Sequence, residues 1–261
     1  MLDLPTSMIG GNRNRVKRTR RELERELAAA ANPERAKSSV WFFKTGKGEY
    51  GEGDRFLGIT VPVQRKIALR YRDLPLDDIA RLLASKIHEH RFVALEILVA
   101  QYERSSGADS ERLFNFYLEQ TARVNNWDLV DTSAPYIVGE HLRERSRDTL
   151  YELARSPLVW ERRIAIVATF SFIKHGETRD TYQIAEILLR DKHELIHKAT
   201  GWALREAGKA SRADLTKFIA KHYGPMNRTT LRYAIEHFSP EERNQILAGN
   251  FLEVSAKVAH R

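Results

Sequence analysis

The sequence predicts an all-α protein, an α-solenoid in which helix pairs stack into a curved, C-shaped single domain. Apolar residues expected in the first helix of each pair recur with a period of about 35 residues, at Leu82, Leu118, Leu153, Leu188 and Tyr223. Small or β-branched residues expected in the second helix recur with the same period, at Ala94, Val130, Ala165, Ala199 and Ala234. Candidate N-cap residues follow the same spacing, at Ser85, Thr121, Ser156 and Asp191. Two helices per period of this length are typical of stacked helical repeats.

The composition fits a protein with a large core and a polyanionic partner. The chain has 261 residues, of which 42% are hydrophobic, and a formal net charge of +8. Lysine and arginine in excess favour nucleic acid because they displace its condensed counterions. The absence of cysteine excludes disulfides, thiolate nucleophiles and cysteine-based zinc sites. No apolar stretch is long enough for a membrane helix, and no export signal is recognisable, so we expect a cytoplasmic protein, nucleoid-associated if bacterial.

The chain is expected to begin with a basic tail. Residues 1–18 are rich in Gly, Asn and Arg and are expected to be disordered, and a solvated tail without function remains an alternative for their charge. Thr19–Ala31 is predicted to be a charged amphipathic helix that ends before Asn32 and Pro33. Residues 19–261 are then predicted to form one repeat domain.

A glycine-rich segment, Lys44–Asp54, precedes the repeats. It lacks the glycine and lysine spacing of a phosphate-binding loop, which disfavours nucleotide hydrolysis. A turn-rich connection is one interpretation. The other is a loop in which Lys44 or Lys47 meets a DNA phosphate near the aromatic run Trp41–Phe43.

Asp131 departs most sharply from the repeat pattern. One position after the small-residue column the units carry Leu95, Asp131, Ile166, Thr200 and Ile235, so a carboxylate occupies a mostly apolar position. Trp127 lies four residues earlier, on the same face of the predicted helix. A surface aspartate that is solvated or paired with an arginine remains the alternative.

Two further departures follow in the next units. Trp202 stands where the other units carry Ile97, Ser133, Ala168 and His237. Arg163 enters the second helix one repeat after Trp127, where its guanidinium could bind a phosphate through two hydrogen bonds. A core tryptophan and an ordinary surface arginine beside Glu161 are the alternatives.

His193-Glu194-Leu195-Ile196-His197 matches the H-E-x-x-H pattern of zinc hydrolases. The repeat pattern instead places Asp191 at an N-cap and Glu194 at the third helical position, where it would complete a capping box. No third ligand follows. We therefore expect no metal site and no cofactor.

The order of several motifs across about residues 30 to 240 resembles the DNA alkylation repair (AlkD-like) glycosylases. The motifs are Phe56-Leu57-Gly58-Ile59 with Pro62 and Arg65, Trp127-Asp128-Leu129-Val130-Asp131, Trp160-x-x-Arg163 and Lys198-Ala199-Thr200-Gly201-Trp202-Ala203-Leu204-Arg205-Glu206. The resemblance implies HEAT-like repeats that clamp duplex DNA containing alkylated bases. It also implies a monomer that releases cationic N3- or N7-alkylated purines.

The resemblance assigns roles residue by residue. Asp131 matches the catalytic carboxylate, Trp127 and Trp202 match two indoles beside the sugar of the lesion, and Arg163 matches an arginine at the adjoining backbone. The DNA-binding positions that it implies are Arg205, Lys209, Thr60, Arg65, Phe42 and Lys44. Phe42 stands about where the family has a tyrosine, and the Lys44–Arg55 loop is longer than in the best-known members.

The implied reaction needs few catalytic groups. An alkylated purine that already carries positive charge can leave without a general acid, so only the oxocarbenium-like sugar needs stabilisation, which Asp131 can supply while it orients water. Two alternatives stay open. One is a non-catalytic HEAT-like protein that binds branched or damaged DNA, and the other is a protein-binding scaffold.

Overall fold

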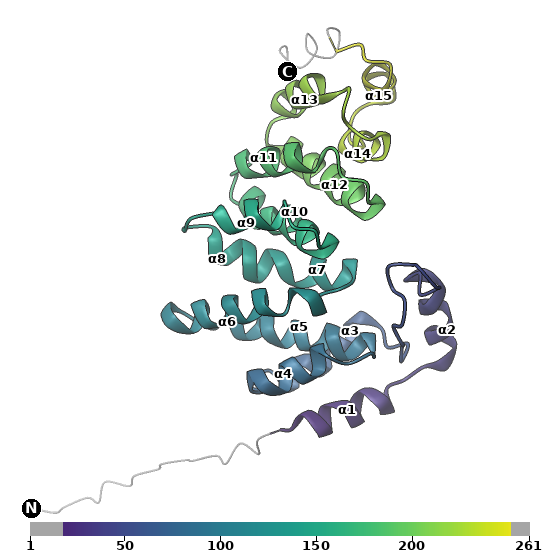
Figure 1. Cartoon of the computed structure of the whole chain (residues 1–261), viewed down its shortest axis with the longest axis vertical. Helices are drawn as coiled ribbons and strands as arrows, with labels where there is room; N and C mark the ends of the chain where they lie inside the picture. The colour runs from purple at the N-terminus through teal and green to yellow at the C-terminus, as the bar shows by residue number, and fades with distance from the viewer. Residues whose placement is uncertain (1–17, 252–261) are drawn as a thin grey trace, which may run out of the picture.

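The computed structural model describes residues 18–251, and its helices stack into one curved array (Figure 1). Within that range the only β-type pairing is an isolated bridge between Arg55 and Ile87. The predicted all-α solenoid is therefore confirmed, whereas the predicted tail lies almost wholly outside the described residues. The helices are α1 (Arg20–Ala29), α2 (Pro33–Phe42), α3 (Val61–Arg70), α4 (Leu76–Leu83), α5 (His88–Tyr102), α6 (Gly107–Glu119), α7 (Trp127–Ala134), α8 (Glu140–Leu142), α9 (Asp148–Leu153), α10 (Val159–Lys174), α11 (Arg179–Leu188), α12 (Glu194–Ala210), α13 (Arg212–His222), α14 (Arg228–Ala234) and α15 (Pro240–Leu247).

Both repeat columns lie where the sequence predicts. Leu82, Leu118, Leu153 and Leu188 belong to α4, α6, α9 and α11, and Tyr223 ends α13. The small-residue column falls on α5, α7, α10, α12 and α14, and all of its members are buried. Small side chains there let successive helices approach closely. A leucine in their place would overpack the contact, typically at a cost of about 1–3 kcal/mol.

The predicted N-caps are wrong: three of them lie two residues before the true N-cap, and Thr121 lies five residues before it. The side chains of Ser85, Ser156 and Asp191 accept hydrogen bonds from the backbone N–H groups of Ile87, Leu158 and His193, which are the true N-caps of α5, α10 and α12. Each predicted residue thus closes a turn that leads into a helix. Thr121 instead begins a short 3₁₀ segment, and Asn126 caps α7.

The helix that carries Trp127 and Asp131 changes its winding directly after them. A π-helical segment, Pro135–Gly139, connects α7 to α8. Pro135 has no N–H to donate, which favours a departure from the α-helical hydrogen-bond ladder. Gly139 lies so close to α10 that an added Cβ would be 2.3 Å from the Ala168 carbonyl oxygen. The segment therefore seats this helix tightly against the next repeat.

The N-terminal end combines an anchored helix with an exposed one. Helix α1 matches the predicted helix except that it ends earlier, at Ala29; Thr19 forms a capping box with Glu22, and Leu23 and Leu27 are buried. Helix α2 has no buried residue and stands beside the array, on the side of α3 and α12 (Figure 1).

Candidate functional site

A cleft of about 520 Å³ opens where the segment Phe42–Tyr50 meets the second helices of the repeats. It is lined by Phe42, Lys44, Tyr50, Trp127, Arg163, Leu195, Lys198, Ala199, Trp202, Arg205 and Tyr233. The cleft thus brings together three of the residues singled out as candidate catalytic groups, Trp127, Arg163 and Trp202. Successive units supply them, from α7, α10 and α12.

Asp131 joins the cleft through Arg163. Arg163 Nε donates to Asp131 Oδ1 at 2.9 Å and Arg163 Nη2 donates to Oδ2 at 2.8 Å, while Nη1 donates to the Leu195 carbonyl at 2.9 Å. The Arg163 side chain is 6% exposed and the Asp131 side chain is 19% exposed. The carboxylate is therefore fixed in orientation yet keeps an accessible edge.

The charge state of Asp131 reflects opposing influences. Burial raises its pKa above the ordinary aspartate value, and the charge of Asp128 raises it further. The charge and hydrogen bonds of Arg163 act in the opposite direction, and the net pKa remains raised. Removing either neighbouring charge would change how much of the carboxylate is ionised.

The Trp127 indole is held by aromatic rings from the N-terminal segment. Phe43 stacks on it with ring centroids 5.5 Å apart and an interplanar angle of 18°. Phe42 contacts it edge-on at 5.8 Å. Burial raises the pKa of the Tyr50 hydroxyl, against the effect of a hydrogen bond with the Trp127 side chain. Trp127 itself lines the cleft.

The C-terminal wall carries Trp202 and several cations. Trp202 packs on Phe170, with ring centroids 4.3 Å apart. Arg205 forms ion pairs with Glu206 and Glu236. Lys209 pairs with Glu206 at 2.5 Å and is not among the residues that line the cleft.

Lys44 links the glycine-rich loop to this wall. Its backbone has a positive φ of 50°, and its Nζ lies 3.9 Å from Glu194 Oε2. The other oxygen of Glu194 is 2.6 Å from Lys198 Nζ. A single carboxylate thus bridges two lysines across the mouth of the cleft.

Thr60 and Arg65 lie elsewhere. Thr60 lines a separate groove of about 540 Å³ between α2 and α3, together with Arg35, Ser38, Ser39, Trp41, Phe42, Gly58, Ile59 and Val61. Trp41 is 84% exposed. Arg65 Nε donates to Glu96 at 2.9 Å, and the hydroxyl of Thr132, the neighbour of Asp131, donates to the same glutamate. Phe42 is common to the groove and the cleft.

The H-E-x-x-H residues have other roles. The predicted capping box at Glu194 is wrong, because Glu194 is the first residue of α12 and pairs with Lys198. His193 Nδ1 accepts from the Leu195 N–H, and His197 Nε2 donates to the Asp191 carbonyl at 2.6 Å. In residues 18–251 no group of three or more His, Asp or Glu side chains is placed to hold a metal ion.

Several cleft residues escaped the sequence analysis. Tyr50 lies in the glycine-rich segment, where no periodicity marks a buried face. Lys198 and Tyr233 stand one position before the small-residue column, where the earlier units carry Val93, Leu129 and Ile164. This departure from purely apolar residues could have marked both. None of the helices in the described part of the chain is long and apolar enough to cross a membrane.

The chain is similar to known proteins both in sequence profile and in fold. The profile of a family described as DNA alkylation repair enzyme matches residues 23–238. A solved structure described as a predicted DNA alkylation repair enzyme from Enterococcus faecalis is similar, with a TM-score of 0.63 and 17% identity over 80% of this chain and 97% of that chain. At this identity the similarity shows the fold alone. No curated protein matches the chain.

Proposed function

Because the chain belongs to the DNA alkylation repair enzyme family, we propose that it is a DNA glycosylase that releases cationic N3- or N7-alkylated purines from duplex DNA. The observation that carries the proposal is the carboxylate of Asp131, held through both oxygens by Arg163 beside a cleft that contains two tryptophans. Family membership supports a role in DNA repair, and this arrangement supports the choice of reaction.

The reaction needs one stabilised charge and one water molecule. When the bond between C1′ and the purine nitrogen breaks, its electron pair neutralises the positive charge of the alkylated base. The sugar is left oxocarbenium-like, and the ionised Asp131 stabilises it electrostatically. Water then adds to C1′ and loses a proton to Asp131 or to solvent. No proton donor to the base is required.

The two tryptophans would stabilise the same cation. Trp127 and Trp202 both line the cleft, on helices of different repeats. An indole face near a sugar cation contributes a cation–π attraction of about 1–2 kcal/mol where water is excluded. Because Phe43 stacks on Trp127, the indole would keep its orientation before DNA binds.

Arg163 receives a narrower role than the expected phosphate contact. Three of its N–H donors already bind Asp131 and the Leu195 carbonyl, and its side chain is nearly buried. We propose that it orients Asp131. The phosphates on either side of the lesion would then meet the more accessible cations of the cleft, Lys44, Lys198 and Arg205.

Excision from methylated duplex DNA tests the proposal. We expect wild-type protein to release 7-methylguanine with chelator present, which also tests the zinc interpretation of His193 and His197. Asp131→Asn should lose most of this release and bind DNA nearly as well. Asp109→Asn, which changes an exposed carboxylate on α6, is the matched control and should act as wild type. Equal excision by wild type and Asp131→Asn would overturn the assignment; binding without excision by wild type would favour the non-catalytic alternative.

A further inference from the structure

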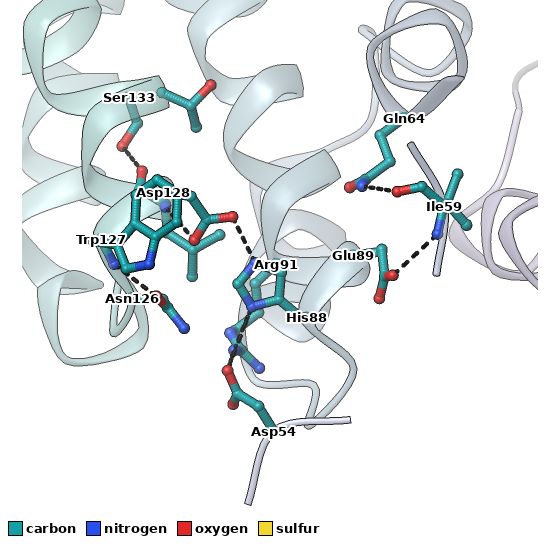
Figure 2. A network of polar contacts seen from close by, with 12 residues as sticks. Asp54, Ile59, Gln64, His88, Glu89, Arg91, Asn126, Trp127, Asp128 and Ser133 are labelled. Carbon is teal, nitrogen blue, oxygen red and sulfur yellow. Dashed lines mark hydrogen bonds and ion pairs between the residues drawn. The ribbon is translucent and has the colours of Figure 1, made fainter. Parts of the chain in front are cut away.

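A buried histidine lies directly behind the candidate site. His88, the first residue of α5, has a side chain that is 3% exposed. Its Nε2 lies 2.7 Å from Asp128 Oδ2, and its Nδ1 lies 3.4 Å from Asp54 Oδ2 (Figure 2). Each ring nitrogen therefore faces a carboxylate, an arrangement that suits a doubly protonated imidazolium.

Aromatic rings connect His88 to Trp127. The imidazole lies against Phe43 and Phe56, with centroids 4.7 and 4.9 Å away. Phe43 in turn stacks on the Trp127 indole. His88 is thus hydrogen-bonded to Asp128, the residue after Trp127, and packs against Phe43, which stacks on Trp127.

The charges in this cluster balance only if His88 is protonated. Asp54 has a guanidinium partner, since Arg91 Nη2 donates to Asp54 Oδ2 at 2.6 Å. Asp128 has His88. Burial lowers the pKa of His88, and so does the charge of Arg91, whose Nη2 lies 3.4 Å from His88 Nδ1. The charge and hydrogen bond of Asp128, with the hydrogen bond of Asp54, outweigh both effects, and the pKa rises to about 9.

Asp128 also acts on Asp131, three residues further along α7. Its negative charge raises the pKa of Asp131. Arg163 on α10 binds the carboxylate of Asp131. The hydroxyl of Tyr117 on α6 is hydrogen-bonded to Ser133, and burial and the charge of Asp131 raise its pKa. From α5, Glu96 reaches the neighbouring Thr132 and is paired with Arg65.

We propose that the His88–Asp128 ion pair positions α7 for catalysis. The pair offsets the charge of Asp128, so that Asp131 stays ionised, and it holds the Trp127 indole in its stack with Phe43. This inference rests on the proposed function for its kinetic consequence. The ion pair itself is independent of that function.

The kinetic test uses two variants with opposite expected effects. His88→Gln leaves the Asp128 charge without a partner, so the acid limb of the pH profile for single-turnover 7-methylguanine release should move to higher pH. Asp128→Asn removes the charge, so the limb should move to lower pH. A shift on the order of half a pH unit in each direction is expected for charges one helix turn apart. His90→Gln, a buried histidine of α5 paired with Ser85, is the matched control and should leave the limb unchanged.

The opposite directions separate positioning from simple destabilisation. A purely structural role would lower the rate in both variants without moving the limbs apart, and that result would overturn the inference. Limb shifts in one common direction would also overturn it.

Nuclear magnetic resonance of the DNA-free wild-type protein supplies the readout that does not depend on activity or on the folding of a variant. The ¹⁵N signals of His88 should show an imidazolium at pH 7.5, and the ¹³C carboxyl titration of Asp131 should shift in the variants that fold. A neutral His88 at that pH would overturn the inference. A wild type that shows this imidazolium but releases no purine would refute the proposed function and leave the ion pair supported.

Discussion

Arg163 donates hydrogen bonds to both carboxylate oxygens of Asp131, from Nε at 2.9 Å and from Nη2 at 2.8 Å. A third donor of the same guanidinium binds the backbone carbonyl of Leu195. Asp131, Arg163 and Leu195 belong to α7, α10 and α12. The orientation of the carboxylate is therefore set by three successive inner helices and not by α7 alone.

Arg163→Lys should reduce catalysis and leave DNA affinity nearly unchanged. An ammonium group cannot hold both oxygens in the planar geometry of a guanidinium. A displacement of a catalytic group by about 1 Å can cost about 100-fold in rate, so we expect single-turnover release to fall by about that factor. The dependence of affinity on salt should not change. A salt slope reduced by about one would show instead that Arg163 contacts a phosphate. Arg162→Lys, which alters the neighbouring pair with Asp191, is the control for general destabilisation.

Trp41→Ala should weaken duplex binding without unfolding the protein. The side chain is 84% exposed and lines the groove beside α2 that shares Phe42 with the cleft. Burial of part of an exposed indole against the sugar-phosphate backbone contributes about 1 kcal/mol or more, so affinity measured by fluorescence anisotropy should fall at least fivefold. The free energy of unfolding should change by less than about 0.5 kcal/mol. Leu69→Ala, a change to an exposed apolar residue of α3, is the control, and equal affinity of both variants would count against DNA contact at the groove.

Gly58→Ala should destabilise the segment that packs against the start of α2. Gly58 has a φ of 77°, and an added Cβ would lie 2.2 Å from the Asn32 carbonyl oxygen and 2.5 Å from the Ala36 nitrogen. Backbone strain and the steric clash together should lower the free energy of unfolding by about 2–4 kcal/mol. Gly48→Ala is the matched control because its φ is 80° and nothing lies within 4 Å of an added Cβ. It should cost about 1 kcal/mol. Equal losses in urea unfolding would mean that strain alone acts at Gly58.

The stability of the protein should fall as His88 loses its proton. The pKa of His88 rises from 6.5 to about 9 in the folded state. A raised histidine pKa stabilises the fold fully below the unfolded value, and this contribution is lost as the pH rises through the folded value. The free energy of unfolding should therefore decrease between about pH 6.5 and 9, by at most roughly 3 kcal/mol. His88→Gln should flatten this slope, and a slope that remains in the variant would assign it to another group.

The repeat period predicted the fold because stacking imposes the same packing requirement on every unit. Ala94, Val130 and Ala199 face the same close helix contact, so the sequence repeats a small or β-branched residue there. The same regularity marked Asp131 and Trp202 as departures. The expectation that Trp127, Arg163 and Trp202 share one site came from the family resemblance, and all three line the same cleft.

Other features depend on distances that no repeat encodes. The contact between Arg163 and Asp131 depends on the angle between α7 and α10, so the sequence suggested a phosphate partner for the guanidinium. The N-caps were misplaced because Ser85, Ser156 and Asp191 bond to a backbone N–H two residues ahead, in turns that precede the helices. Tyr50 reaches the cleft from the glycine-rich segment, where local composition does not reveal which side chains fold inward.

If the proposed function holds, the site takes its residues from three successive units, Trp127 and Asp131 from one and Arg163 and Trp202 from the next two, and this distribution limits how the chain can evolve. Repeat arrays change length readily by duplication or loss of a unit, because each unit contacts only its neighbours. A unit gained or lost between α7 and α12 would separate Asp131 from Arg163 or Trp202 and would remove the site in a single event. Units added after α14 would leave that spacing intact. The array can therefore gain units after α14 and keep the site, whereas a unit gained or lost between α7 and α12 would disrupt it.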